Sequence, residues 1–566
     1  MVMEVLQKAF ACHQSGNLAD AVRLYREFIS SVPDHPEAHH LLGVACMQAG
    51  NLRDAISSLS RAAQLNRNNP NYFNNLGLAQ FYANDFIAAR DNYGRALELV
   101  PNSADYLNNM GMALQKLGDL EAALDRFSAA LKIKPDDPET LHNFGVALRD
   151  ASLLEQSAAA LTRSIRLSGG IPESHSTLAA VLFLLNDLGG AIDSCWASVK
   201  MDPTHIDGHK CFKGIMLAED RPSEKYDTFR WACEAAPDDA AVHLQFGMEM
   251  NLDGAFADAL PVLRRALELN PALPMAHAGL GRALSALGHH DEAISRFDKA
   301  AELEPDNSQI LEGFGQSLIR AGRDDRAVSV LKDAHRLAPR VSTVLGNMTI
   351  AMVNAEDPSV DGFVDYENDV VTRMLPVPEG FSDLAAFNDA LHAELAVRHQ
   401  AGSIPLDQTM RGGTQIPNNL FAKASGCTLA VKNGITALIH EYVSGLEPDA
   451  DHPFRRFINR DFQFTGAWST ILYGAGYDAS HVHNEGWMSG VYYVKVPDLP
   501  EELWAAGEGC IQFGAPPDEF VNDRNRTRRL IRPRPGMLVL FPSYVWHGVK
   551  PFTQEGLRHS IAFDII

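Results

Sequence analysis

Three histidines and a glutamate near the end of the chain have the spacing of a metal site. His481, His483 and Glu485 occupy alternate positions, so they share one face if this segment is the end of a strand. His547 follows 64 residues after His483. Imidazole ligands suit a non-heme iron, and such a cluster holds the ion on one side and leaves other coordination positions open. The spacing therefore predicts an iron site.

An arginine and a serine follow this cluster, on the segment expected to be the last strand. Arg558 comes eleven residues after His547, and Ser560 stands two residues further on, on the same face of an extended segment. A guanidinium can bind a carboxylate through two parallel hydrogen bonds, and the serine hydroxyl can add a third. The pair therefore predicts a binding site for a small carboxylate.

The segments that position these residues have the patterns of short strands with supporting helices. After a connector at Met374–Gly380, helical periodicity covers Phe381–Gln400 and Leu429–Leu446. Short alternating runs with Gly and Pro between them then dominate. These runs are Phe464–Tyr473, Ser489–Val496, Gly509–Gly514, Met537–Phe541 and Arg558–Ile565. We therefore expect a jelly roll preceded by helices, in a domain over residues 376–566.

The first three fifths of the chain repeat with a period of 34 residues. Each unit has a small residue at one position, an alanine at a second and a proline at a third, for example Gly77, Ala89 and Pro101. Two small residues let antiparallel helices approach closely, and the proline ends the second helix. The pattern resembles the tetratricopeptide repeat (TPR). It predicts about ten repeats in an all-α superhelix over residues 1–340, then a capping helix and connector over 341–375. Departures at Gly169–Pro172 and Arg221–Lys225 predict a change of curvature.

Asparagines recur on the helix that should line the concave face of this superhelix. Asn75, Asn109 and Asn143 stand two residues before the small position in three consecutive repeats. The series resembles the asparagine ladder of O-linked N-acetylglucosamine transferase. An amide can both donate to and accept from a peptide backbone, so one interpretation is a groove that holds an extended peptide. The other is that these amides only cap or solvate the helices.

The histidines, arginine and serine together resemble the iron(II)- and 2-oxoglutarate-dependent oxygenases, whose signature is His-x-Asp/Glu, a distal His and Arg-x-Ser. More closely, residues 376–566 resemble bacterial TPR-plus-oxygenase proteins with His-Val-His-x-x-Gly-Trp and an Arg-Gly-Gly-Thr-Gln run, here Arg411–Gln415. The resemblance implies a double-stranded β-helix that uses Fe(II), 2-oxoglutarate and O2. It implies that Arg558 and Ser560 bind 2-oxoglutarate, and Tyr493 is a further candidate through its hydroxyl.

Two alignments with the iron signature stay open. In one, His481 and His483 are ligands with His547, and a histidine replaces the usual acid. In the other, His483 and Glu485 restore the ordinary pattern. We favour the first, because the similar bacterial proteins share His-x-His. A cupin also begins with His-x-His, but its glutamate would fall on Trp487 or Met488, so that family lacks a ligand here.

Composition excludes several classes of function. A net charge of −22 repels phosphate backbones and anionic membrane surfaces, so neither nucleic acid nor a membrane is an expected partner. The longest apolar runs, such as Leu178–Leu185, are too short to span a bilayer, and Met1–Gln14 lacks the pattern of a secretory signal. Seven scattered cysteines without a CxxC pair predict reduced thiols. We therefore expect a cytoplasmic protein.

The combined expectation is an oxygenase whose repeats capture a protein or peptide and whose second part hydroxylates a side chain of it. One alternative is a non-catalytic TPR adaptor with a degenerate oxygenase domain, and succinate formation would separate the two. Another is an oxygenase of a small metabolite, in which the repeats serve assembly only.

Overall fold

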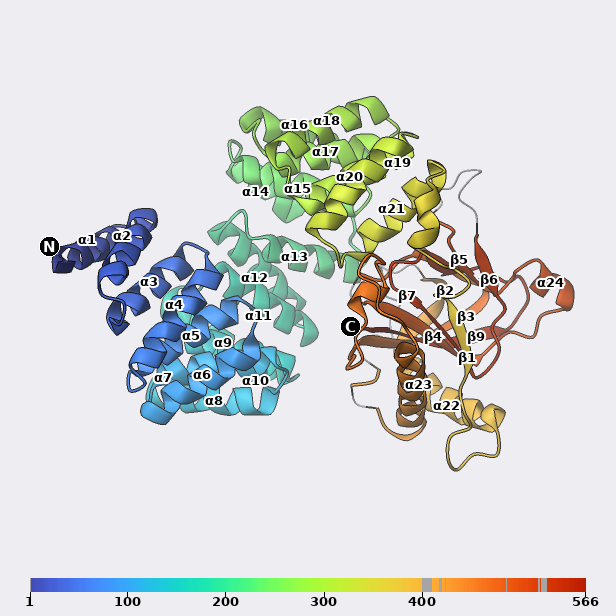
Figure 1. Ribbon diagram of the computed structural model, residues 1–566, viewed down its shortest axis with the longest axis horizontal. Coiled ribbons are helices and arrows are strands. Elements are labelled where there is room, and N and C mark those ends of the chain that lie inside the picture. The colour runs from blue at the N-terminus through green and yellow to red at the C-terminus, as the bar shows by residue number, and fades with distance from the viewer. Residues whose placement is uncertain are drawn as a thin grey trace. The chain divides into compact units, whose positions relative to one another are not determined.

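The computed structural model describes residues 2–399, 410–416, 420–422, 424–484, 486–517, 520 and 527–566. It divides into two compact units, Met1–Gln245 and Phe246–Ile566. The division falls inside the series of repeats, so the second unit contains the last repeats together with the sheet (Figure 1).

Antiparallel helix pairs make up the described residues up to position 354. In the first unit the helices are α1 (Val2–Gln14), α2 (Leu18–Ser31), α3 (Pro36–Gln48), α4 (Leu52–Leu65), α5 (Pro70–Tyr82), α6 (Phe86–Leu99), α7 (Ala104–Lys116), α8 (Leu120–Ile133), α9 (Pro138–Asp150), α10 (Leu154–Ser168), α11 (Pro172–Leu184), α12 (Leu188–Met201), α13 (Ile206–Ala218) and α14 (Asp227–Ala235). Then follow α15 (Ala240–Leu252), α16 (Phe256–Leu269), α17 (Pro274–Ala286), α18 (His290–Leu303), α19 (Ser308–Arg320), α20 (Asp324–Leu337) and α21 (Ser342–Asn354).

The small residues of the repeat lie where the two helices of a pair touch. A Cβ added to Gly77 would lie 2.8 Å from the ring of Tyr93, and one added to Gly111 would lie 2.8 Å from the ring of Phe127. Real Cβ contacts do not occur at such distances, so any larger residue would push the helices apart. The close packing confirms the predicted helix pairs and gives the physical reason for the 34-residue series.

The two predicted irregularities coincide with altered helix ends. The helix α10 ends at Gly169, which has a left-handed φ of 78°, and Gly170 continues in the same region with 81°. The helix α14 starts only at Asp227 and has 9 residues, because turns occupy the preceding segment 222–226. The curvature of the array is a separate property, and its predicted change stays a prediction.

The sheet of the second unit is antiparallel throughout the described residues. Its strands are β1 (Val371–Met374), β2 (Met410–Ile416), β3 (Phe464–His481), β4 (Met488–Lys495), β5 (Ile511–Phe513), β6 (Arg529–Ile531), β7 (Met537–Pro542), β8 (His547–Val549) and β9 (Leu557–Ile565). The accompanying helices are η1 (Pro358–Gly362), α22 (Leu384–His399), α23 (Gly426–Ser444), η2 (Arg455–Phe457) and α24 (Glu501–Ala505).

The strand order is β1-β7-β4-β9-β3-β8-β5-β6, with β2 also paired to β3. The five predicted strands and the two predicted helices are all present. The strand β3 extends well beyond the predicted Tyr473, as far as His481, and pairs first with β9 and then with β8. This extension carries the chain from the centre of the sheet to the first candidate ligand.

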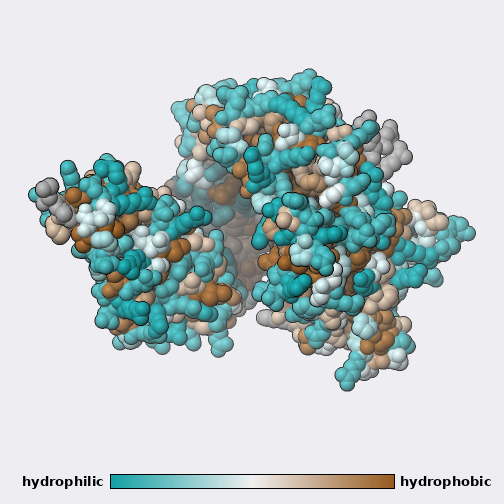
Figure 2. All heavy atoms as spheres, viewed as in Figure 1, coloured by the Kyte–Doolittle hydropathy of each residue, from teal (hydrophilic) through white to brown (hydrophobic). Residues whose placement is uncertain are grey.

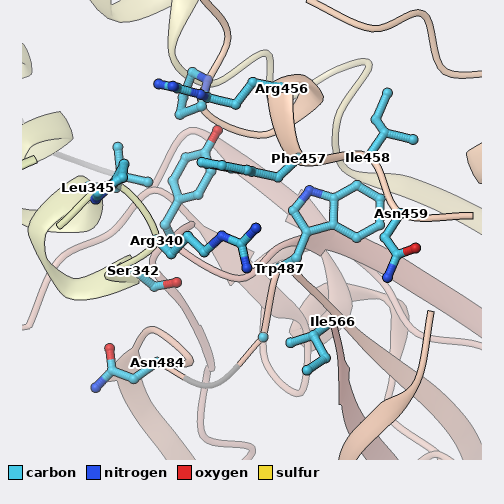
Figure 3. Close-up of a pocket in the computed structure, with 14 residues that line it drawn as sticks. Arg340, Ser342, Leu345, Arg456, Phe457, Ile458, Asn459, Asn484, Trp487 and Ile566 are labelled. Atoms are coloured by element: carbon cyan, nitrogen blue, oxygen red, sulfur yellow. The ribbon is translucent and has the colours of Figure 1, made fainter. Parts of the chain in front are cut away.

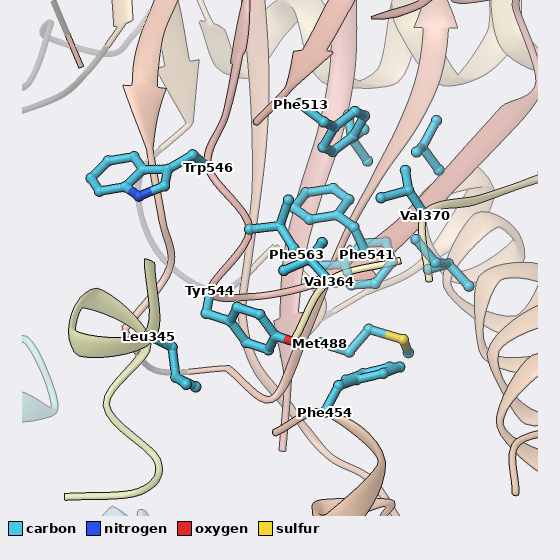
Figure 4. Close-up of a cluster of buried hydrophobic side chains, with 14 of the residues drawn as sticks. Leu345, Val364, Val370, Phe454, Met488, Phe513, Phe541, Tyr544, Trp546 and Phe563 are labelled. Atoms are coloured by element: carbon cyan, nitrogen blue, oxygen red, sulfur yellow. The ribbon is translucent and has the colours of Figure 1, made fainter. Parts of the chain in front are cut away.

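One hydrophobic core runs through the second unit, from the last repeats into the sheet. It contains Phe314 of α19 and Leu345 of α21 together with Phe541 of β7 and Phe563 of β9. Figure 4 shows Leu345 in the same cluster as these sheet residues. Gly346 continues this contact, because an added Cβ would meet the Trp546 indole nitrogen at 2.9 Å. The helix α21 is therefore packed directly on the sheet.

Polar side chains cover most of the face of each unit seen in Figure 2. Among the described residues, no helix is both long and apolar enough to cross a lipid bilayer.

Candidate metal centre

Strand pairing brings the three predicted histidines together. His481 at the end of β3 is the direct cross-strand partner of His547 at the start of β8. His483 lies two residues beyond His481, and the potential ligand nitrogens of all three rings lie within 4.8 Å of one another. The fourth candidate, Glu485, lies outside the described residues. The structure thus brings together the ligand set of the first alignment.

Each of the three rings has an acceptor at its Nδ1 atom. His481 Nδ1 lies 2.8 Å from the carbonyl oxygen of Ala479, and His547 Nδ1 lies 3.0 Å from that of Val545. His483 Nδ1 lies 2.6 Å from Oδ1 of Asp564. Carbonyl and carboxylate oxygens only accept, so Nδ1 must carry the proton in each neutral ring. The Nε2 atoms then carry free lone pairs, which is the form that binds a metal.

The distance between two of these Nε2 atoms tests whether a cation fits. His481 Nε2 and His483 Nε2 lie 3.1 Å apart. Neither Nε2 atom carries a proton when Nδ1 of the same neutral ring is the donor. Two facing lone pairs repel unless a cation or a proton lies between them. The donor set is nitrogen only, which suits iron and similar transition ions better than magnesium or calcium. The residues present therefore fit a metal.

Burial favours the neutral form of the His481 and His547 rings. Burial lowers the pKa of His547 well below its usual value, and the neighbouring His481 and His483 lower it further. Burial likewise lowers the pKa of His481, although Asp478 opposes this effect. Neutral imidazoles can bind a cation without first losing a proton to solvent.

Asp564 is a site residue that the sequence analysis missed. Its carboxylate is 6% exposed, contacts His483, and accepts a hydrogen bond from Ser489 Oγ at 2.5 Å. The signal was present, because Asp564 shares the alternating face of β9 with Arg558 and Ser560. A carboxylate behind a histidine ligand fixes the ring and raises its basicity. Asp564 therefore places a carboxylate behind one of the three candidate ligands.

The predicted carboxylate-binding residues meet across three strands. Ser560 of β9 pairs with Thr470 of β3 on one side and with Tyr493 of β4 on the other. Arg558 donates from Nη2 to the Tyr493 hydroxyl at 3.1 Å and from Nη1 to Ser560 Oγ at 3.4 Å. Its guanidinium carbon lies 4.8 Å from the centre of the Tyr493 ring. All three predicted residues therefore belong to one cluster.

Arg558 is buried and, within the described part of the chain, has no carboxylate partner. It is 2% exposed, and its Nε atom has no hydrogen-bond partner. A buried guanidinium without an anion is costly, so the site favours a negatively charged ligand. Arg558 and Ser560 line the same narrow cavity of about 50 Å³ as His481, His483 and His547.

Two further polar features adjoin the cavity. Asp478 lines it, with Oδ1 buried, without a hydrogen-bond partner and 4.0 Å from His481 Nδ1. On the other face of β9, His559 Nε2 lies 2.7 Å from Ser469 Oγ, and its Nδ1 lies 2.9 Å from that of His392. Burial lowers the pKa of His559 to about 3. The strand that carries Arg558 is thus held from behind by neutral histidines.

The predicted asparagine series lies in the first unit. Asn109 donates to Asn74 at 2.9 Å, Asn143 donates to Asn108 at 3.0 Å, and Asn75 contacts His40 Nε2 at 2.8 Å. Each contact joins one repeat to the preceding repeat. The three asparagines are half-buried, so the amides stabilise the stacking of repeats, and peptide binding stays a prediction.

The sequence matches known families in both parts. Residues 466–564 match a family described as "Putative 2OG-Fe(II) oxygenase". Two TPR families match residues 13–76 and 252–298, and residues 74–138 and 279–341. The chain therefore combines TPR repeats with a domain of that oxygenase family, and TPR repeats are protein-interaction modules.

Several solved structures are similar to parts of this chain. MamA is 23% identical over 28% of this chain and 94% of its own, with a TM-score of 0.27. PilF of Pseudomonas aeruginosa is 16% identical over 37% and 95%, with a TM-score of 0.33. The Thermus thermophilus protein TTC0263 is 19% identical over 32% and 100%, with a TM-score of 0.29. No curated protein matches the chain.

Proposed function

We propose that this chain is an Fe(II)- and 2-oxoglutarate-dependent dioxygenase that hydroxylates a protein or peptide bound by its repeats. The observation that carries the proposal is a buried guanidinium without an anionic partner among the described residues, in the same cavity as three histidines whose potential ligand nitrogens lie within 4.8 Å of one another. The buried Arg558 guanidinium favours a carboxylate ligand, and the three histidines favour a cation. The oxygenase family match agrees with both.

In this proposal His481, His483 and His547 hold iron through Nε2. Their Nδ1 protons are fixed by the Ala479 carbonyl, Asp564 and the Val545 carbonyl, so the rings need no reorientation when the metal binds. The usual signature has a carboxylate ligand that neutralises part of the charge of the iron, and this chain has His483 in its place. Asp564, in contact with His483, would partly take over that role.

Arg558, Ser560 and Tyr493 would bind the distal carboxylate of 2-oxoglutarate. Arg558 offers its free Nε–H, and Ser560 and Tyr493 hold the guanidinium in place. Bound iron and 2-oxoglutarate would supply, with O2 as the oxidant, oxidative decarboxylation to succinate and carbon dioxide, in which one oxygen atom of O2 enters succinate and the other is inserted into a substrate C–H bond. The protein binds the reactants, orients them and excludes water from the narrow cavity.

The domain limits belong to this proposal. Residues 1–340 form the repeat array, 341–375 the capping helix and connector, and 376–566 a jelly-roll oxygenase domain. The curled antiparallel sheet supports the jelly roll. All seven cysteines are free thiols, which supports a reducing, cytoplasmic setting.

Succinate formation and iron content test the proposal. Purified protein with iron, 2-oxoglutarate and oxygen should release succinate, and His547→Ala should lose both metal and activity. His440→Ala, at an exposed histidine of α23, is the matched control and should retain both. The first alignment has His481 as a ligand and the second has Glu485 in its place. His481→Ala should therefore abolish metal binding only in the first alignment, and Glu485→Ala only in the second. Full activity in His547→Ala would contradict the metal assignment.

A substrate trap then separates protein hydroxylation from the alternatives. Protein loaded with an inactive metal should retain its partner, and restoring iron should add the mass of one oxygen to that partner. An adaptor would retain a partner without succinate or a mass change. A small-metabolite oxygenase would form succinate without modifying any retained protein.

A further inference from the structure

A second cavity, of about 440 Å³, lies in the second unit between the start of α21 and the sheet (Figure 3). Arg340, Ser342, Phe457 and Trp487 are among its lining residues. Its volume lies within the range of small-ligand pockets, about 300 to 1,000 Å³. Among the predicted site residues that the structure describes, none lines it, so the histidine and arginine cluster does not account for it.

This cavity shares two chain segments with the metal centre. Asn484 and Gly486 line it and stand one and three residues after the candidate ligand His483. Tyr544 also lines it, and stands three residues before His547. An extended peptide advances roughly 3.3 to 3.6 Å per residue, so a segment that fills the cavity could reach the metal centre within a few residues. The cavity is therefore suitably placed to hold a neighbour of the oxidised residue.

Two arginines contribute positive charge to the lining of the cavity. The guanidinium carbons of Arg340 and Arg456 each lie 5.0 Å from the centre of the same Phe457 ring. Both arginines are exposed, and among the described lining residues no side chain is acidic. Cation–π contact holds a guanidinium without using its N–H donors. The donors therefore stay available to an anion, in a chain whose net charge of −22 repels anions generally.

The wall behind the arginines is apolar and fixed. The Trp487 indole donates to the Phe454 carbonyl oxygen at 2.8 Å and stacks on the Phe454 ring at 4.9 Å. Leu345 and Tyr544 are buried beside it. A ligand that fits has a carboxylate for the arginines and an apolar group for this wall.

We propose that this cavity binds an acidic side chain with an apolar neighbour in the substrate protein, and so selects the segment presented to the metal centre. This inference rests on the proposed function, and it names the substrate class: a protein with an acidic and an apolar residue close to the hydroxylation site. Charge complementarity determines the occupant, because a neutral or basic segment would leave both guanidiniums without a partner.

Peptide binding to the full-length, metal-free protein tests this inference. The probes are fluorescein-labelled, amidated 12-residue peptides of Gly and Ser with a central Leu-Glu, Leu-Gln or Leu-Lys pair, followed by anisotropy. The Glu peptide should bind at least fivefold more tightly than the Gln peptide. The double variant Arg340→Gln/Arg456→Gln should abolish this preference. Arg336→Gln is the matched control and should retain it, because Arg336 is exposed on α20 and paired with Asp333.

A charge-reversal variant distinguishes a specific loss of the arginines from misfolding of the protein. Arg340→Glu/Arg456→Glu should prefer the Lys peptide, and a damaged protein cannot acquire a new preference. Equal binding of the Glu and Gln peptides by the wild type would overturn the inference, as would a preference that persists in the double variant. Displacement of the labelled Glu peptide by free glutarate at the concentration at which unlabelled Glu peptide displaces it would make a small acid the occupant of this cavity and would also overturn the inference. The assay needs no metal, so absence of succinate formation would contradict the proposed function alone.

Discussion

Arg558→Met gives the sharpest test of the carboxylate site. The guanidinium is 2% exposed, has a free Nε–H and has no anionic partner among the described residues. Losing one partner of a buried charge pair costs about 2 to 5 kcal/mol, and about 1.4 kcal/mol is a factor of ten in Kd. We therefore expect Arg558→Met to raise the Kd for 2-oxoglutarate roughly thirtyfold to several thousandfold.

The same substitution should change the stability of the ligand-free protein little. Removing a desolvated charge stabilises by about 1 to 4 kcal/mol, whereas leaving the Tyr493 hydroxyl without its partner costs about 1 to 3 kcal/mol. These two effects nearly cancel, so the ligand-free melting temperature should move by only a few degrees. A loss of ligand binding at unchanged stability separates a binding role from a structural one.

Thermal melting of Mn(II)-loaded protein with increasing 2-oxoglutarate measures both quantities. A ligand at a hundred times its Kd stabilises the wild type by about 2.7 kcal/mol, and at the same ligand concentration this increment should fall to about 0.9 kcal/mol or less in Arg558→Met. Arg558→Lys should lose part of it, because an ammonium keeps the charge but cannot form two parallel hydrogen bonds. Arg532→Met is the control, since that arginine is paired with Glu501 at the surface. Wild-type stabilisation by 2-oxoglutarate in Arg558→Met would refute the reasoning.

Three further outcomes are expected. Asp564→Asn should weaken metal binding roughly 10- to 100-fold in competition with a fluorescent chelator, because the carboxylate orients His483; unchanged affinity would remove this role. Replacing Asn75, Asn109 and Asn143 together by Ala should weaken binding of a trapped protein substrate by a few kcal/mol, at about 1 kcal/mol per hydrogen bond, while the repeats stay folded; equal affinities would restrict the series to the stacking of repeats. Burial lowers the pKa of His559 to about 3 in the folded chain, whereas the same histidine has a pKa near 6.5 in the unfolded chain. Between these two values the unfolded chain binds more protons than the folded chain. The free energy of unfolding therefore decreases as pH falls from about 6.5 towards 3. His559→Gln should therefore reduce the slope of stability against pH by up to about 1.4 kcal/mol per pH unit, and parallel melting curves from pH 7 to 5 would contradict this.

The parts of the fold that follow from short-range pattern were predictable. The 34-residue period predicted the helix pairs, because Gly77 and Gly111 leave room only for the ring of one partner helix. Alternation predicted the main strands. Short or glycine-containing strands gave too weak a pattern: β8 has only three residues, and β2 contains Gly412 and Gly413. β2 and β8 form strands because the backbone of β3 offers hydrogen-bond partners along its edge.

Residue types and their spacing indicate which side chains could bind a metal and a carboxylate, because alternation and strand order keep His481 and His483, and Arg558 and Ser560, together. The surroundings of these side chains depend on how distant segments pack in the folded chain. The Nδ1 acceptors, the contact between Asp564 and His483, and the cavity at Arg340 and Arg456 join residues that are far apart in the chain or depend on backbone carbonyls. Such contacts come from sheet register and from packing of α21 on the sheet, and local periodicity carries no information about either.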